Sequence, residues 1–294
     1  MPPTIRHLEH IEEMFLVEDL QRRVWGADDA IVPHHLLLTV AHNGGVILGA
    51  YVEAQMVGFV FGFPGLFQTP EGPQIKHCSH MLAVLPEYES QGIGYYLKRA
   101  QWQMVRQQGI PLITWTYDPL LSRNAHLNIA RLGAICNTYV PNMYGDMRDS
   151  LNQGLPSDRL QVDVWVNTPR VQNRMSKRPR SQLDLAHYLS AETNILNPTH
   201  LDENGWPLPT SSTSLPAPAE KTASPALYLL EIPSNFYALK TTQPALALQW
   251  RLHIRKLLQR LFARGYLITD FVYLKGEHPR SFYVLSDGER TLGE

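Results

Sequence analysis

The segment most suited to chemistry is the glycine-containing turn Gln91-Gly92-Ile93-Gly94, which follows the apolar run 81–85 and Pro86. An apolar run stopped by proline predicts a strand, and the helical spacing of apolar residues after Gly92 predicts a helix. A helix start leaves backbone N–H groups unpaired and carries partial positive charge, so this turn suits a phosphate or pyrophosphate. Glycine is also common in turns that bind nothing, so the turn alone does not distinguish an anion site from a plain turn before a helix.

Two nucleotide-binding motifs are excluded by particular residues. The turn lacks the Lys-Ser/Thr pair of a P-loop, and it lacks three glycines at GxGxxG spacing. What remains is a ligand that carries a pyrophosphate, is held mainly by backbone groups and has an arm that lies along the preceding strand. Coenzyme A fits that description.

The same residues resemble the acyl-CoA signature of the GNAT superfamily of N-acyltransferases, [Gln/Arg]-x-x-Gly-x-[Gly/Ala] after a strand that ends in Val-x-Pro. Here Val84-Leu85-Pro86 precedes Gln91-Gly92-Ile93-Gly94, while the leading Gln/Arg position is Glu89, which adds negative charge beside a pyrophosphate. In element order the resemblance covers residues 5–166, and the segment 118–159 is similar to a GNAT branch with a C-terminal extension. It implies an α/β fold (α+β, mixed sheet) with a smaller C-terminal segment.

The resemblance also implies an acyl-CoA co-substrate, such as acetyl-CoA or succinyl-CoA, and direct attack of an amine on the thioester in a ternary complex. The pantetheine arm would lie on the strand end, with the Val84 N–H bound to the thioester carbonyl, and the pyrophosphate would rest on the turn. Leu82 and Val84 could also be plain core residues. The implied cofactor-binding positions are Leu82, Ala83, Val84, Ser90, Gln91, Gly92, Ile93, Gly94, Tyr95 and Asn124.

Direct attack requires a base, and the first candidate is His80. It precedes Val84 by four residues, which the two-residue period of a strand would place on the same face, and an imidazole titrates near neutral pH. Its alternative role is a hydrogen bond within the sheet. The rival base is Asp118, just after the next strand, which could instead cap the helix that follows Pro119.

The acid that protonates the thiolate is less well defined. The tyrosine that the family resemblance implies on the next helix corresponds to Ile129. Tyr144 or Tyr139 could supply the proton from the following segment, or water could do so. Each tyrosine could also be a packing residue.

The helices and strands that would position these residues are predicted from the spacing of apolar residues and from the glycines and prolines that end each segment. Helices are expected at 9–25, 34–41, 92–108 and 124–132, and strands at 46–53, 56–63, 77–85, 112–117, 134–140 and 160–166. Residues 1–166 therefore form the expected GNAT-like domain. Residues 167–225, rich in Pro, Ser and Thr, form an irregular connection.

Residues 226–294 again show order, with a strand at 227–232, a helix at 244–264 and strands at 267–273 and 281–285. This strand-helix-strand-strand order matches that of residues 112–166, so the segment is either a degenerate half-GNAT repeat or an α+β appendage that covers an edge or forms a homodimer contact. The basic side chains on its helix, Arg251 and Arg255 among them, indicate a solvated face or a pocket for an acidic substrate.

Composition limits the functional classes. The chain has 294 residues with 26 Lys+Arg against 27 Asp+Glu, which argues against a nucleic-acid-binding protein. Its two cysteines form no disulfide framework or zinc motif, and no apolar run reaches the length of a membrane span. We expect a cytoplasmic, metal-free acetyltransferase acting on a small amine such as an amino acid; the alternative is a catalytically weak acyl-CoA-binding sensor or interaction module.

Overall fold

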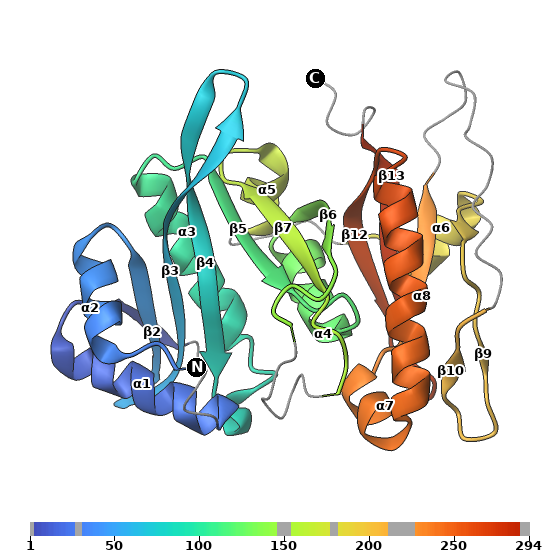
Figure 1. Cartoon of the computed structure of the whole chain (residues 1–294), viewed down its shortest axis with the longest axis horizontal. Helices are drawn as coiled ribbons and strands as arrows, with labels where there is room; N and C mark the ends of the chain where they lie inside the picture. Colours follow the sequence, from blue (N-terminus) through green and yellow to red (C-terminus); the bar gives the residue numbers. More distant parts are fainter. Residues whose placement is uncertain (1–2, 27–30, 146–153, 177–181, 211–226, 289–294) are drawn as a thin grey trace. The chain divides into compact units, whose positions relative to one another are not determined.

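The computed structural model describes residues 3–26, 31–145, 154–176, 182–210 and 227–288 (Figure 1). These residues form two compact units. The first comprises the described residues up to 115 together with 163–175, and the second comprises those in 116–162 and from 176 onward. Each unit combines separate stretches of the chain, so the units do not test the domain boundaries expected at residues 166 and 225, which stay predictions.

The first unit is a mixed sheet with helices. Strands β1 to β4 pair in order as antiparallel neighbours, and β5 joins β4 in parallel, which confirms the predicted mixed α/β fold. Its elements are β1 (Thr4–His7), α1 (Ile11–Trp25), α2 (His34–His42), β2 (Val46–Val52), β3 (Gln55–Thr69), β4 (Gly72–Val84), a 3-10 turn (Pro86–Tyr88), α3 (Ile93–Gln107), most of β5 (Leu112–Tyr117), the end of β7 (Arg159–Trp165) and α5 (Pro169–Arg174).

Helices α1 and α3 cover opposite faces of this sheet (Figure 1). Phe59 of β3 contacts the ring of Trp25 in α1 at 6.1 Å between centroids. The neighbouring Gly58 faces the other way, since a Cβ atom there would lie 3.4 Å from Leu97 of α3. Successive strand residues point to opposite faces, so the two contacts fix which helix lies on which side.

A β-bulge interrupts the pairing of β3 with β4. Phe61 pairs with Met81 and Gly62 pairs with Ser79, so His80 is the extra residue. The bulge overturns the expectation that His80 and Val84 share a face, because it shifts the alternation between them. Val84 lies toward α3, 3.3 Å from the Cβ position of Gly58, whereas His80 lies with aromatic residues on the opposite face.

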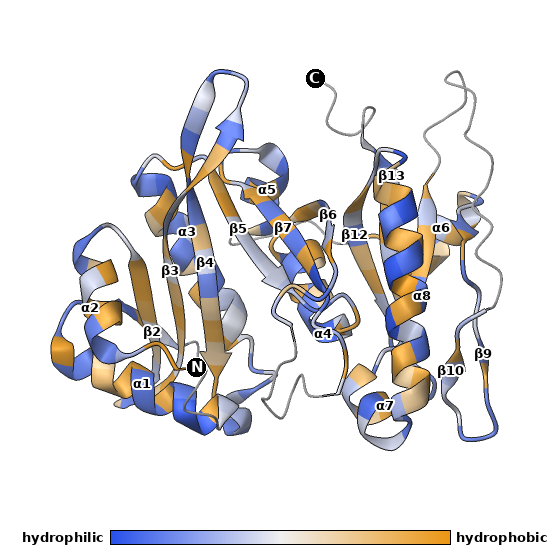
Figure 2. Ribbon diagram, in the orientation of Figure 1, coloured by the Kyte–Doolittle hydropathy of each residue, from blue (hydrophilic) through white to orange (hydrophobic). Residues whose placement is uncertain are grey.

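Within the second unit, strands are neighbours in the order β6-β12-β13-β11-β8, and α8 packs on β6 and β12. Trp250, Ile254 and Leu257 of α8 are buried, and hydropathy alternates along this helix (Figure 2). The remaining elements are α4 (Ser122–Ala125), a π-helical turn (His126–Arg131), β6 (Ile135–Val140), α6 (Leu185–Ser190), β8 (Asn194–Ile195), β9 (His200–Leu201), β10 (Pro207–Leu208), β11 (Tyr228–Ile232), α7 (Phe236–Thr242), α8 (Pro244–Phe262), β12 (Tyr266–Leu274) and β13 (Arg280–Asp287).

The predicted elements are found with few exceptions. The strand-helix-strand-strand order expected for 226–294 is present, with the short α7 inserted. The β3–β4 hairpin is longer than expected, and β1 was missed. The connection 167–225 contains short elements between residues 169 and 208, while its Pro-rich residues 211–225 lie outside the described part of the chain.

Candidate functional site

The end of β4 has an open edge. Strands β4 and β5 pair at His77–Ile113 and Cys78–Thr114, and the structure records no further pair of these two strands among its described residues. The N–H of Leu85 donates to the carbonyl of Val57 in β3 at 2.9 Å. Because N–H directions alternate along a strand, the N–H groups of Val84 and Leu82 point to the other edge. Backbone donors are thus available where a ligand could add to the sheet.

The turn after β4 also presents backbone donors. Ser90 and Gly92 adopt positive φ values of 63° and 79°, and Gly92 is the N-cap of α3. The N–H groups of Tyr95 and Tyr96 both donate to the Gly92 carbonyl. In the described part of the chain no backbone acceptor is recorded for the N–H groups of Ile93 and Gly94. The geometry suits an anion placed at the start of the helix.

The beginning of α3 is held in place from one side. The Tyr95 hydroxyl donates to the carbonyl of Arg174 at 3.3 Å, and the Arg99 Nε donates to that of Met175 at 2.8 Å. These bonds anchor α3 to the end of α5 within the first unit. The Tyr95 side chain is therefore occupied, and any contact of this residue with a cofactor would involve its backbone.

His80 lies at the bulge with an exposed ring. Its centroid is 5.9 Å from those of both Phe61 and Phe63. Partial burial against these rings lowers the pKa of His80 below its ordinary value of 6.5. The imidazole is consequently neutral at pH 7 and can accept a proton.

A buried polar network, which sequence reasoning missed, lies on the α3 side of β4. The Lys98 Nζ donates to the Ser79 Oγ at 2.7 Å and lies 3.8 Å from the centre of the Trp115 ring. The Ser79 hydroxyl donates to Gln101 at 2.8 Å, and the Gln101 amide contacts the His77 Nε2 at 3.2 Å. Burial lowers the pKa of Lys98 to about 7 and that of His77 to about 3. The network joins α3 to the residues just before the bulge.

Asp118, the rival base, is in the second unit and is already paired. Both carboxylate oxygens accept hydrogen bonds from Arg251 of α8, at 2.8 and 2.5 Å. The Leu120 N–H donates to the same carboxylate at 2.9 Å, as expected for a residue that caps the following turn. Arg251 and the Leu120 N–H thus engage both oxygens of this buried carboxylate, so the geometry favours a structural role.

The other candidates of the second unit differ in their availability. Tyr144 is 49% exposed, with its hydroxyl 3.0 Å from that of Thr116. Tyr139 donates to Asp158 at 2.5 Å, and burial raises its pKa far above the usual value. Asn124 is half-buried on α4. The roles of Tyr144 as acid and Asn124 as cofactor contact stay predictions.

Two basic residues of α8, Arg251 and Arg255, have partners within the second unit. Arg251 pairs with Asp118, and Arg255 donates two hydrogen bonds to Asp158 at 2.8 and 2.6 Å. These two guanidinium groups therefore stabilise the second unit and do not form the solvated face or acidic-substrate pocket that their spacing indicated.

The described residues contain neither a membrane-length apolar helix nor a cluster of metal-ligand side chains. None of these helices is long and apolar enough to cross a bilayer. No three of the described His, Cys, Asp and Glu side chains are grouped as metal ligands would be.

No family model and no curated protein matches the chain. Similar solved structures include the ribosomal-protein-S18-alanine N-acetyltransferase from Escherichia coli, at 15% identity and a TM-score of 0.43, covering 56% of this chain and 95% of that chain. The aminoglycoside 6'-acetyltransferase type Ii is 16% identical, with a TM-score of 0.44 and coverage of 56% and 98%. At such values the function has to be argued from the residues of this chain.

Proposed function

We propose that the protein is an acyl-CoA-dependent N-acyltransferase of the GNAT type, which transfers an acetyl or similar acyl group to the amine of a small molecule. The observation that carries the proposal is the continuity of two donor sets in the first unit. The open edge of β4, with the Val84 and Leu82 N–H groups, leads directly into the turn that presents the N–H groups of Ile93 and Gly94. Acyl-CoA, with an extended pantetheine arm followed by a pyrophosphate, carries hydrogen-bond acceptors that match these two donor sets in order.

In the proposed reaction, Val84 stabilises the oxyanion and His80 acts as the base. The Val84 N–H donates to the thioester carbonyl and stabilises the oxyanion as the amine attacks. His80, neutral at pH 7, removes a proton from the substrate ammonium through water, because the bulge sets its ring on the face opposite the Val84 side chain. The free amine then attacks the thioester. The C–N bond forms, the C–S bond breaks, and the CoA thiolate leaves. Because a thiol has a pKa of ~8.5, water can protonate this leaving group.

Calorimetric titration with CoA, acetyl-CoA and succinyl-CoA tests the cofactor site without knowledge of the acceptor. We expect micromolar binding, lost in Gly92→Glu, because a carboxylate at the helix start repels a pyrophosphate. Gly92 has a φ of 79°, and a Cβ there would lie 3.9 Å from its nearest neighbour, so the variant adds strain and charge without a clash.

Gly109→Glu is the matched control. Gly109 has a φ of 74° at the other end of α3, with open space around it, so it carries the same backbone strain. Equal losses in both variants would point to damage of α3 and would contradict the proposal, as would unchanged affinity in Gly92→Glu.

The second candidate, an acyl-CoA-binding module with little turnover, is favoured by the exposed Glu89 at the turn and by the buried Ile129 at the position of the family tyrosine. Thiol release measured with a panel of amines separates the two. Binding with turnover supports the enzyme, whereas binding without turnover supports the module.

A further inference from the structure

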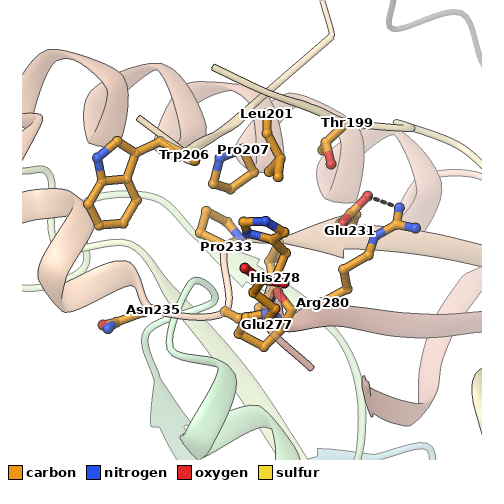
Figure 3. Close-up of a pocket in the computed structure, with 14 residues that line it drawn as sticks. Thr199, Leu201, Trp206, Pro207, Glu231, Pro233, Asn235, Glu277, His278 and Arg280 are labelled. Atoms are coloured by element: carbon orange, nitrogen blue, oxygen red, sulfur yellow. Dashed lines mark hydrogen bonds and ion pairs between the residues drawn. The ribbon is translucent and has the colours of Figure 1, made fainter. Parts of the chain in front are cut away.

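A pocket in the second unit has the lining of a ligand site (Figure 3). Its volume is about 350 Å³, at the lower end of the range for small-molecule sites. One wall comes from the β9–β10 hairpin, and the other from the segment after β11 and the turn before β13. The apolar lining consists of Leu201, Trp206, Pro207, Ile232, Pro233 and Pro279.

Hydrogen bonds hold both walls. Asp202 accepts from the N–H groups of Asn204 and Trp206, which fixes the β9–β10 turn. Trp250 of α8 donates to the Pro207 carbonyl at 2.8 Å. On the other wall the Ser234 hydroxyl donates to the Pro279 carbonyl at 2.8 Å. The pocket is thus built before any ligand enters, which reduces the entropy cost of binding.

The charged groups at one end of the pocket are the ion pair between Glu231 and Arg280 (Figure 3). Glu231 lies in β11, between buried apolar residues, and its side chain is 4% exposed. Arg280 donates to its two oxygens from Nε and Nη2 at 2.8 and 2.7 Å. This contact occupies one edge of a guanidinium that is 37% exposed, and the Nη1 edge remains for a second planar anion such as a carboxylate.

The charged residues of the lining favour a ligand that carries both a positive and a negative charge. Glu231 balances Arg280, while Glu277 at the rim has no ion-pair partner among the described residues. A ligand with only a carboxylate would add negative charge to this surplus. A ligand that also carries an ammonium group can place it near Glu277, and an apolar side chain can pack on Trp206 and the prolines.

We infer that this pocket binds a small zwitterion with an apolar side chain, of the α-amino acid class, through Arg280 and Glu277. The site lies wholly within the second unit and requires no acyl-CoA. It is therefore separate from the donor site proposed on β4 and α3, and either can fail without the other.

Calorimetry or ligand-observed NMR with three probes tests the inference. The probes are leucine, isoamylamine, which lacks the carboxylate, and 4-methylpentanoate, which lacks the ammonium. We expect leucine to bind at least tenfold more tightly than either analogue. Arg280→Lys keeps the charge but loses the planar fork, and it should weaken leucine binding about tenfold. Arg106→Lys, on an exposed position of α3, should leave it unchanged.

Glu277→Gln gives the sharpest readout, because the residue is exposed and the variant should fold normally. It should weaken leucine binding and strengthen binding of 4-methylpentanoate. Equal binding of all three probes, no binding of leucine to the wild-type protein, or the same direction of change for both ligands in Glu277→Gln would overturn the inference.

Discussion

Arg251 and Asp118 form a buried ion pair with two hydrogen bonds, at 2.8 and 2.5 Å, between α8 and the loop after β5. The Arg251 side chain is 2% exposed, and its guanidinium lies 5.5 Å from the centre of the Phe236 ring. Residues 133 positions apart in the chain are thereby fixed to one another inside the second unit. The pair connects the C-terminal segment to the loop that carries Asp118, which the sequence left open as either a rival base or a helix cap.

Removal of one partner should be costly. Asp118→Asn leaves the Arg251 charge buried without a counter-ion, and we expect a loss of about 3–5 kcal/mol in the free energy of unfolding. Replacing both partners, as in Asp118→Leu with Arg251→Met, should recover most of that loss, because apolar side chains need no counter-ion. Chemical denaturation of the single and double variants measures the difference.

Asp184→Asn is the control for this prediction. Asp184 is an exposed carboxylate that pairs with His187, and asparagine can still cap α6, so the expected change is below about 1 kcal/mol. If Asp118→Asn keeps its stability but loses thiol release, Asp118 acts in catalysis and the structural role is wrong.

The base assignment predicts a pH profile. His80 must be neutral to accept a proton, and burial lowers its pKa below 6.5, so kcat/KM should rise with pH on the acid side with a midpoint below pH 6.5. His80→Gln should reduce kcat about 100-fold and remove this rise. His35→Gln, at an exposed histidine of the same unit, should change neither. A His80→Gln enzyme with full activity would exclude His80 as the base.

Asp163 in β7 predicts a stability effect of definite sign. Burial raises its pKa from 3.8 to about 6, against the attraction of Lys76. Between pH 4 and 6 the folded chain therefore binds more protons than the unfolded chain, and stability falls as pH rises. Asp163→Asn should raise the Tm at pH 7 and leave it nearly unchanged at pH 4. Glu71→Gln, an exposed control, should show no such difference between the two pH values.

Much of the fold could be predicted from local signals. Gly26 and Gly109, with φ values of 70° and 74°, mark helix ends that composition already indicated, and β5 begins and ends at the predicted residues. The short β1 lacked a signal of its own, since four residues with two exposed positions have no clear periodicity. The bulge at His80 was invisible for a different reason: it depends on register with β3, which is a non-local property.

The site was predictable to the extent that it consists of backbone. The glycine at Gly92 and the proline at Pro86 locate the turn, and the structure places it after β4 as expected. Side-chain partners depend on tertiary packing, so the capture of Asp118 by Arg251 could not be read from spacing. The network of Lys98 and Gln101 was missed because polar residues next to an apolar helix face are usually exposed.

Lys98 offers a test of that network. Burial lowers its pKa to about 7, against 10.5 in the unfolded chain, so between these values the unfolded chain binds more protons and stability rises with pH. Below pH 7 both states are charged and the full desolvation cost remains. Lys98→Met should raise stability at pH 6 and remove most of the rise between pH 7 and 10, by up to about 4 kcal/mol from the size of the shift. Unfolding titrations across this range measure the slope, with Lys256→Met as an exposed control. A Lys98→Met protein that keeps the wild-type slope would show that the lysine stays charged when folded, held by Ser79 and the Trp115 ring.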